Sequence, residues 1–156
     1  MELKKHFITT NRPYQEGTVE VFQQKLKSNN AKKVTLTITA LGLYEAEING
    51  IKVGDALFTP GFTYYPTHLY YQTYDITDML TGEDTLNVHL AQGWYCGRFT
   101  FENKVQIYGE HPAVSWILTV EDKNGVHTFC SDDPSVEAIL SPYGYAGFYD
   151  GEVYNE

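Results

Sequence analysis

Apolar and polar residues alternate along most of this chain with a period of two, which is the pattern of a β-strand that buries one face. The alternation is clearest over residues 33–40, where Val, Leu, Ile and Ala take every second position and Lys or Thr lies between them. Similar runs cover residues 86–90, 114–120 and 126–130, and an aromatic, β-branched run covers residues 69–77. Several short strands about ten residues apart predict an all-β fold, an antiparallel β-sandwich.

Turns between these strands are marked by glycine. The alternation changes phase at Gly42, which predicts a bulge or a bend, and then Tyr44, Ala46 and Ile48 continue the apolar face. Asn49-Gly50 predicts a type I′ hairpin, because that turn needs two residues with positive φ. A second reversal is expected at residues 123–125.

Helical structure is expected only as one or two short turns. The most helical segment is residues 75–82, where Asp75 or Thr77 would cap the N-terminus and Gly82 would end the turn. Residues 58–68 contain three glycine or proline breaks and predict a loop. With 156 residues and no internal repeat or linker, the chain is expected to form one domain.

Charge and composition narrow the possible partners. The 11 basic and 20 acidic residues give a net charge of −9, which argues against nucleic acid and anionic membranes but fits a neutral ligand, a cation or simple solubility. No apolar run is long enough for a transmembrane helix, and the N-terminus lacks the apolar stretch of a signal peptide, so a cytoplasmic location is expected. Cys96 and Cys130 are expected to be reduced thiols.

Several motifs together resemble the N-terminal β-sandwich module of bacterial α-L-rhamnosidases. The resemblance covers residues 18–156, and its ordered set of motifs is specific. The motifs are Ala40-Leu41-Gly42-Leu43-Tyr44-Glu45, Ile48-Asn49-Gly50, Val53-Gly54-Asp55, Thr59-Pro60-Gly61, Tyr71-Gln72-Thr73-Tyr74-Asp75-Ile76-Thr77, Gly93-Trp94-Tyr95-x-Gly97-Arg98 and the closing residues 148–156.

The resemblance implies a jelly-roll, galactose-binding-like sandwich over residues 1–156. Residues 1–17 would be an irregular N-terminal extension, and residues 148–156 would lead toward a catalytic domain absent from this sequence. In the full enzymes a separate (α/α)₆ barrel carries the acidic catalytic residues and hydrolyses terminal α-L-rhamnose with inversion. This fragment is therefore expected to have no catalytic residue and no activity of its own.

Two roles remain open on that resemblance. The module would help in carbohydrate recognition or substrate positioning, binding L-rhamnose or a rhamnoside; alternatively it is a structural module that only packs on the barrel. No cofactor is expected to be required. Calcium accompanies the sugar in some members of the family, but no calcium motif is present here, and the metal site is left unknown.

Candidate sugar-binding residues are Asn49, Trp94, Tyr95 and Arg98. An indole stacks on the C–H face of a sugar, and a guanidinium binds its hydroxyls. Each residue also has a structural interpretation. Trp94 would close one end of the sandwich, Arg98 would pair with a local carboxylate, and Asn49 would only form its turn.

Other chemistries find little support. The acidic pair Glu45 and Glu47 is expected to be a solvated strand face rather than a glycosidase dyad. The five histidines and two cysteines lack zinc-ligand spacing, no nucleotide-binding loop is present, and Cys96 has no base beside it. Gln92 stands where the family pattern favours Asn or Asp, which argues against a metal-bridging contact there.

Overall fold

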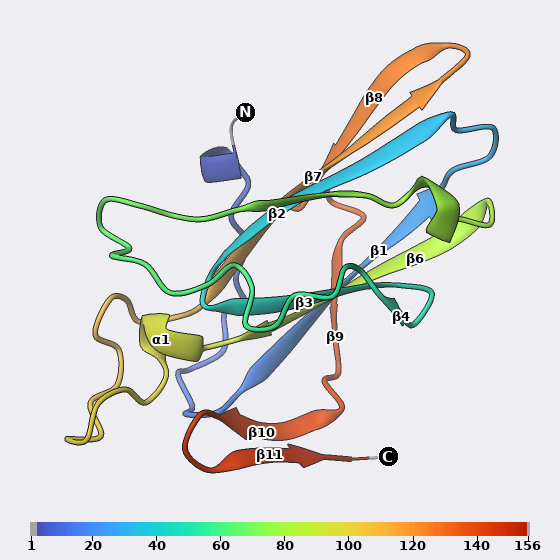
Figure 1. Cartoon of the computed structure of the whole chain (residues 1–156). Helices are drawn as coiled ribbons and strands as arrows, with labels where there is room; N and C mark the ends of the chain where they lie inside the picture. The colour runs from blue at the N-terminus through green and yellow to red at the C-terminus, as the bar shows by residue number, and fades with distance from the viewer. Residues whose placement is uncertain (1–2, 156) are drawn as a thin grey trace.

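Two antiparallel β-sheets face each other in a computed structural model that describes residues 3–155 (Figure 1). The five-stranded sheet has the order β4 (Ile51–Lys52), β3 (Leu43–Ile48), β6 (Glu83–Ala91), β1 (Val19–Lys27) and β9 (Glu137–Ile139). The four-stranded sheet has the order β5 (Gln72–Asp75), β2 (Lys33–Leu41), β7 (Ala113–Asp122) and β8 (Gly125–Cys130). The last two strands, β10 (Tyr143–Gly147) and β11 (Gly151–Tyr154), form a separate hairpin. All pairings among the described strands are antiparallel, so the predicted antiparallel sandwich is confirmed.

Most of the core is formed by the apolar faces that the alternation predicts, and Phe22 and Leu26 of β1, a strand that the sequence pattern did not indicate, add to it. Burying these side chains supplies the main driving force for pairing the two sheets. Trp116 is the largest fully buried side chain, and its indole N–H donates to the Gln24 side-chain oxygen at 2.9 Å. The predicted core residues buried in the sandwich are Val34, Leu36, Ile38, Ala40, Tyr44, Ala46, Ile48, Leu86, Val88, Leu90, Val114 and Leu118.

The predicted bend at Gly42 is the point where the chain crosses from one sheet to the other. β2 ends at Leu41 in the four-stranded sheet, and β3 starts at Leu43 in the five-stranded sheet. Gly42 has a φ of 131°, and a Cβ atom at this position would lie 2.4 Å from the carbonyl oxygen of Ala91. Glycine is therefore required by both the backbone angle and the space.

The predicted Asn49-Gly50 hairpin is confirmed. Ile48 pairs with Ile51 across a two-residue turn, and Asn49 and Gly50 have φ values of 53° and 79°. These angles are those of a type I′ turn. The reversal at residues 123–124 is likewise present and joins β7 to β8, with the Asp122 carboxylate accepting from the backbone N–H groups of Asn124 and Gly125.

Helical structure in the described residues is limited to one α-helical turn, α1 (Gly93–Cys96), and two 3₁₀ turns, η1 (Leu3–Lys5) and η2 (Thr77–Met79). The expected capping of η2 is wrong in detail. The N-cap is Ile76, and the turn ends at Met79 before Gly82 is reached. Asp75 still supports the turn, because its carboxylate accepts from the Thr77 N–H and hydroxyl, and these bonds lower the pKa of Asp75.

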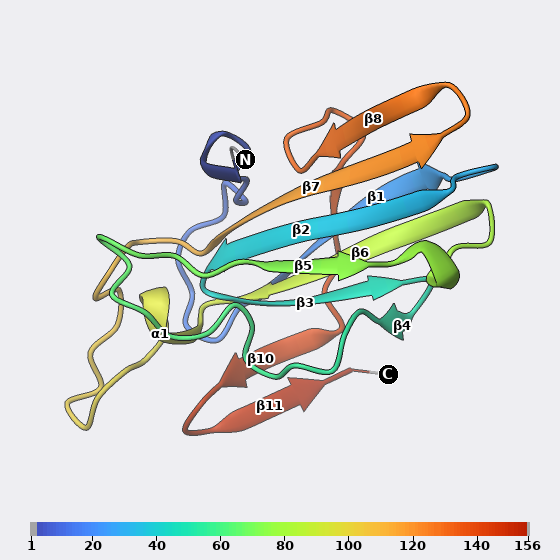
Figure 2. The ribbon, with the colours of Figure 1, turned by 45° about the horizontal axis from the view of Figure 1, so that its top comes forward.

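Three segments differ from the sequence pattern in length, burial or conformation. The strand expected over residues 69–77 is shortened to β5, and β8 is an exposed edge strand that adds little to the core. Residues 148–155 form the turn and second strand of the β10–β11 hairpin, which packs beside β1 and the five-stranded sheet (Figure 2). Within residues 3–155, no helix is long and apolar enough to cross a membrane.

Candidate functional site

The stretch Gln92–Phe99 lies at the end of the sandwich where β6 finishes (Figure 2). The sequence predicts the start of a loop here, but the chain first forms the single helical turn α1, which begins at Gly93. Gly93 has a φ of 51°, and a Cβ atom there would lie 2.6 Å from the Leu43 side chain. Glycine is therefore required at this position by both the backbone angle and the space.

Trp94 is half-buried and stacks on Phe148, which lies at the turn of the β10–β11 hairpin. The ring centroids are 4.5 Å apart with an interplanar angle of 27°. Phe58 and Phe62 contact the same indole at 6.2 Å and 5.8 Å. Both of these phenylalanines expose about half of their surface to solvent, so Trp94 joins a partly exposed aromatic surface.

Tyr95 turns toward the loops on the other side of α1. Its ring meets Tyr65 edge-on at 5.2 Å, and its backbone oxygen accepts from the Tyr108 N–H. Burial raises the pKa of Tyr95, with the neighbouring Cys96 adding to the shift. Tyr95 thus holds the loop around residues 106–110 against α1, and it does not line the cleft described below.

Arg98 connects α1 to the hairpin turn. Its guanidinium forms an ion pair with Asp150, and its Nε lies 3.5 Å from a Glu16 carboxylate oxygen. The Tyr149 ring lies below the guanidinium carbon, with 5.6 Å to the ring centroid. The predicted local carboxylate partner is therefore present, while the side chain still borders an open cleft.

The cleft lies between α1 and the β10–β11 hairpin and has a volume of about 320 Å³. Its walls combine the aromatic side chains Phe58 and Phe148 with the charged side chains of Glu16, Arg98 and Glu152. A second groove of about 330 Å³ continues beneath the hairpin and shares Phe58 and Glu152 with the first. Small-ligand sites have this size and this mixture of apolar walls and few polar groups.

Gln92 lines the cleft and connects it to the N-terminal segment. The Gln92 side-chain oxygen accepts from the Gly17 N–H at 2.9 Å, and its amide donates to the Gln15 carbonyl at 2.7 Å. The Gly17 carbonyl in turn accepts from the Ala146 N–H of β10 at 2.8 Å. Gln92 therefore joins the N-terminal segment to α1, a role that its place in the motif did not indicate.

Asn49 lies at the opposite end of the sandwich, in the β3–β4 turn (Figure 1). Its amide N–H donates to Asp84 at 2.7 Å, and its side-chain oxygen accepts from the Thr85 N–H at 2.9 Å. The structure thus places Trp94, Tyr95 and Arg98 at one end of the sandwich and Asn49 at the other, and of these four residues only Arg98 lines the cleft. The sugar-binding role of these four residues stays a prediction.

The aromatic side chains around Trp94 form one connected surface. Successive ring centroids lie between 4.5 and 6.5 Å apart. Its members are Phe58, Phe62, Tyr64, Tyr65, Trp94, Tyr95, Phe99, Tyr108 and Phe148. They come from two loops, from α1 and from the hairpin turn, so sequence reasoning missed most of them; the aromatic richness of the loop at residues 58–65 was the available signal.

Glu45 and Glu47 are both engaged by neighbouring side chains on the outer face of β3. Glu45 pairs with the Lys52 ammonium at 2.6 Å, and Glu47 lies 3.6 Å from His89. His89 faces the second groove, and neither of its ring nitrogens has a hydrogen-bond partner among residues 3–155. This arrangement agrees with the interpretation of the glutamates as a charged strand face.

Comparison with known proteins identifies the family. Residues 29–156 match the family model described as the α-L-rhamnosidase N-terminal domain. The chain belongs to this family. An α-L-rhamnosidase of Streptomyces avermitilis is 36% identical over 132 residues, which are 84% of this chain and 13% of the relative.

Solved structures agree with this assignment of the rhamnosidase N-terminal domain. The native α-L-rhamnosidase of Aspergillus terreus has a TM-score of 0.85 and 32% identity, covering 96% of this chain and 18% of that enzyme. The Streptomyces avermitilis α-L-rhamnosidase complexed with L-rhamnose has a TM-score of 0.80 and 33% identity, covering 89% of this chain and 14% of that enzyme. The chain thus spans only 13–18% of the length of these relatives.

Proposed function

We propose that this rhamnosidase N-terminal domain is a non-catalytic accessory module that recognises a small sugar, L-rhamnose in particular, in the cleft between α1 and the β10–β11 hairpin. The observation that carries the proposal is the cleft itself, where aromatic walls and opposite charges meet at about 320 Å³. Hydrolysis would take place in another part of the parent enzyme, of which this chain is a small fraction.

The cleft offers both kinds of contact that a deoxysugar needs. L-Rhamnose has an apolar face with a methyl group, and Phe58 and Phe148 present aromatic surface for it. Its hydroxyl groups can donate to the carboxylates of Glu16 and Glu152 and accept from the Arg98 guanidinium. A neutral ligand also fits a protein with a net charge of −9, because it brings no charge of its own.

Arg98 is held in place before any ligand arrives. Its ion pairs with Asp150 and Glu16 fix the planar guanidinium at the cleft wall, and Tyr145 donates to the same Asp150 carboxylate at 3.0 Å. A side chain ordered in this way loses little conformational entropy on binding, which favours affinity. Calcium is a possibility that no sequence motif supports, and the acidic side chains at the cleft are the groups that would bind it.

Titration of the isolated domain with L-rhamnose tests the proposal. Backbone amide signals of residues 92–98 and 145–152 should shift with millimolar sugar, in buffer with calcium and in buffer with a chelator. The Phe148→Ala variant should weaken binding about tenfold, equivalent to about 1.4 kcal/mol. Phe129→Ala, which removes a partly exposed ring of the distant edge strand β8, is the matched control and should bind as the wild type.

The absence of shifts at millimolar rhamnose, or shifts scattered away from the cleft, would contradict sugar binding here. Equal weakening by Phe148→Ala and Phe129→Ala would show that the effect comes from general destabilisation. A rhamnoside ending in an aryl group extends the titration to the second groove, which shares Phe58 and Glu152 with the cleft.

A second role is favoured by the connected aromatic surface around Trp94. Exposed aromatic patches of this kind mark surfaces that pack against another protein part. In the parent enzyme that part would be the catalytic barrel, for which this domain would be a structural neighbour. Oxidative footprinting of the isolated domain and of the full-length enzyme distinguishes the roles, because docking should protect Phe62 and Tyr64 only in the full-length protein.

A further inference from the structure

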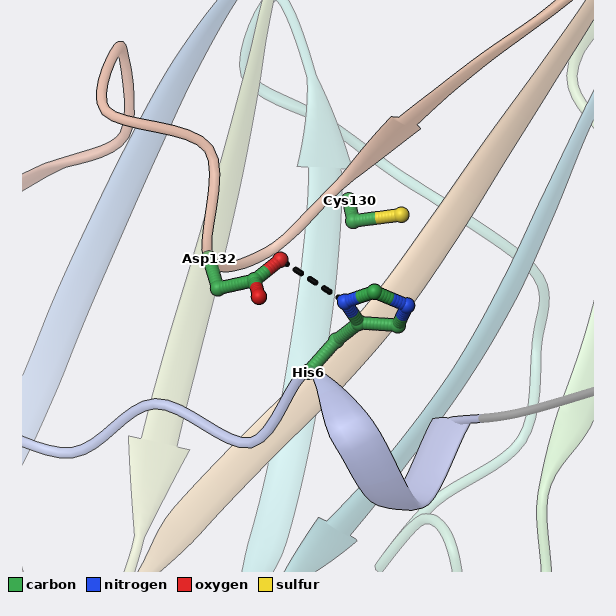
Figure 3. Close-up of side chains that lie close together, drawn as sticks. All are labelled: His6, Cys130 and Asp132. Carbon is green, nitrogen blue, oxygen red and sulfur yellow. Dashed lines mark hydrogen bonds and ion pairs between the residues drawn. The ribbon is translucent and has the colours of Figure 1, made fainter.

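Three potential metal ligands, from the N-terminal segment and from around the end of β8, lie close together. His6 lies just after η1, while Cys130 ends β8 and Asp132 follows it (Figure 3). Each side chain offers one possible ligand atom, and these three atoms all lie within 4.8 Å of one another. The His6 Nδ1 and the Asp132 carboxylate are already 2.8 Å apart.

Buried hydrogen bonds fix the backbone that carries these side chains. Ser131 lies between Cys130 and Asp132 and is buried, and its hydroxyl donates to the His6 carbonyl at 2.5 Å. The Ser131 hydroxyl oxygen also accepts from the backbone N–H of Trp116 at 3.1 Å, so the cluster is anchored to the central strand β7. Farther along the N-terminal segment, Ile8 pairs with Val114, which holds His6 from its other side.

We propose that His6, Cys130 and Asp132 bind a divalent transition-metal ion, with Zn²⁺ the best match, and that water completes its coordination. Imidazole nitrogen, thiolate sulfur and carboxylate oxygen are the three ligand types that zinc takes from proteins. A thiolate and a carboxylate together balance the two positive charges of the ion.

The distances suit a tetrahedral zinc ion. Bonds of about 2.0–2.3 Å to zinc place neighbouring ligand atoms about 3.3–3.6 Å apart. The three ligand atoms already lie within 4.8 Å of one another, and the His6 nitrogen and the Asp132 oxygen are 2.8 Å apart, so only small adjustments separate them from those values. Rotation of the partly exposed Cys130 and Asp132 side chains can provide the remaining adjustment without moving the anchored backbone. Calcium does not fit, because it binds oxygen ligands only.

The ion would cross-link the start of the chain to its last third. His6 and Asp132 are 126 residues apart, and no strand of either sheet includes His6. A bond between such distant residues removes freedom mainly from the unfolded chain, as a disulfide does. Zinc bound in the folded state alone would therefore raise the melting temperature and order the N-terminal segment.

Titration of the whole chain with Co²⁺, followed by displacement with Zn²⁺, tests the site. Cobalt bound through Cys130 should give sulfur-to-metal charge-transfer absorption in the near ultraviolet at one equivalent of metal. Zn²⁺ should abolish that signal and raise the melting temperature. Cys130→Ser should lose the absorption, and His6→Ala should weaken metal binding at least tenfold.

A natural control lies farther along the same β7–β8 hairpin. His127 approaches the Asp122 carboxylate at 3.7 Å, but no thiol belongs to that pair, so His127→Ala should leave the absorption and the affinity unchanged. No charge-transfer band, or a band that survives Cys130→Ser, would overturn the proposal and leave a simple His6–Asp132 ion pair. Circular dichroism of Cys130→Ser, expected to match the wild type, separates loss of the site from loss of the fold.

Discussion

Asp84 is the hydrogen-bonding centre of one end of the sandwich, and replacing it with Asn should destabilise the domain. The residue is 3% exposed. One oxygen accepts from the Asn49 amide and from the N–H and hydroxyl of Thr81, and the other accepts from the Ser28 hydroxyl and the Gly82 N–H. All five contacts are donors, so an amide NH₂ cannot replace either oxygen without conflict.

The size of the expected loss in stability can be worked out for the less disruptive of the two orientations that the Asn side-chain amide can take at this position. With its NH₂ group toward Ser28, the substituted amide side chain leaves the Gly82 N–H without an acceptor, because the hydroxyl alone can rotate. An unsatisfied buried N–H costs about 1–3 kcal/mol, and the remaining bonds lose their ionic character. We expect the free energy of unfolding to fall by about 2–4 kcal/mol, a large part of the stability of a domain.

The loss should depend on pH. Burial by itself would raise the pKa of Asp84, but the hydrogen bonds from Ser28, Asn49 and Thr81 outweigh it and hold the pKa well below its ordinary value. The unfolded chain then binds this proton more readily than the folded one, so the carboxylate stabilises the fold fully above pH ~4 and progressively less below it. The difference between the wild type and Asp84→Asn should therefore shrink as the pH falls below about 4.

Urea denaturation followed by tryptophan fluorescence measures both effects, with the slope of the transition checked for constancy. The neighbouring Glu83→Gln variant makes the same charge change at an exposed position and should alter stability by less than about 0.5 kcal/mol. A loss below about 1 kcal/mol for Asp84→Asn at neutral pH, or a difference that grows in acid, would refute the reasoning.

Three other experiments test the buried interior and the bend at Gly42, where the chain passes from one sheet to the other. Gly42→Ala should cost more than about 2 kcal/mol in urea denaturation, because its Cβ would meet the Ala91 carbonyl at a strained φ; near-neutral stability would contradict this. Cys96 is fully buried, with the pKa of its thiol raised to about 12 by burial, so iodoacetamide should label it only after unfolding, as mass spectrometry can show; labelling of the folded domain would contradict the burial. Gln24→Met should lower the free energy of unfolding by about 1–3 kcal/mol, since the indole N–H of Trp116 loses its acceptor; an unchanged melting curve would count against that bond.

Features that depend on residues close together in the chain were predicted from the sequence, whereas contacts between distant segments were not. Period-two alternation located the buried faces of β2, β3, β6 and β7, because side chains of a strand point alternately to its two sides. Asn49-Gly50 identified its hairpin, since positive φ at two consecutive residues is a local requirement. The resemblance of the motifs then indicated the family, which the match over residues 29–156 confirms.

The candidate site was predicted only in part. Trp94, Tyr95 and Arg98 were selected as candidates because they are close together in the chain, and the structure places them at one end of the sandwich, where only Arg98 of the three lines the cleft. The partners that define their surroundings were not recognised, because Phe148 and Asp150 come from the last hairpin, about fifty residues farther along the chain. Tyr95 proved to face the loops rather than the cleft, a direction that depends on how α1 packs.

The sequence by itself determined the strands β2, β3, β6, β7 and β8, the turns at residues 49–50 and 123–124, and the family of the domain, since these properties depend on residues near one another in the chain or on motif order. It did not indicate β1, β9 or the β10–β11 hairpin. Tertiary structure decided which segments meet. Gly42 sends β3 into the second sheet, the last hairpin folds back to close the cleft on Arg98, and His6 comes to lie beside Cys130 and Asp132. Such contacts depend on the packing of the two sheets as a whole, and no local spacing of residues specifies them.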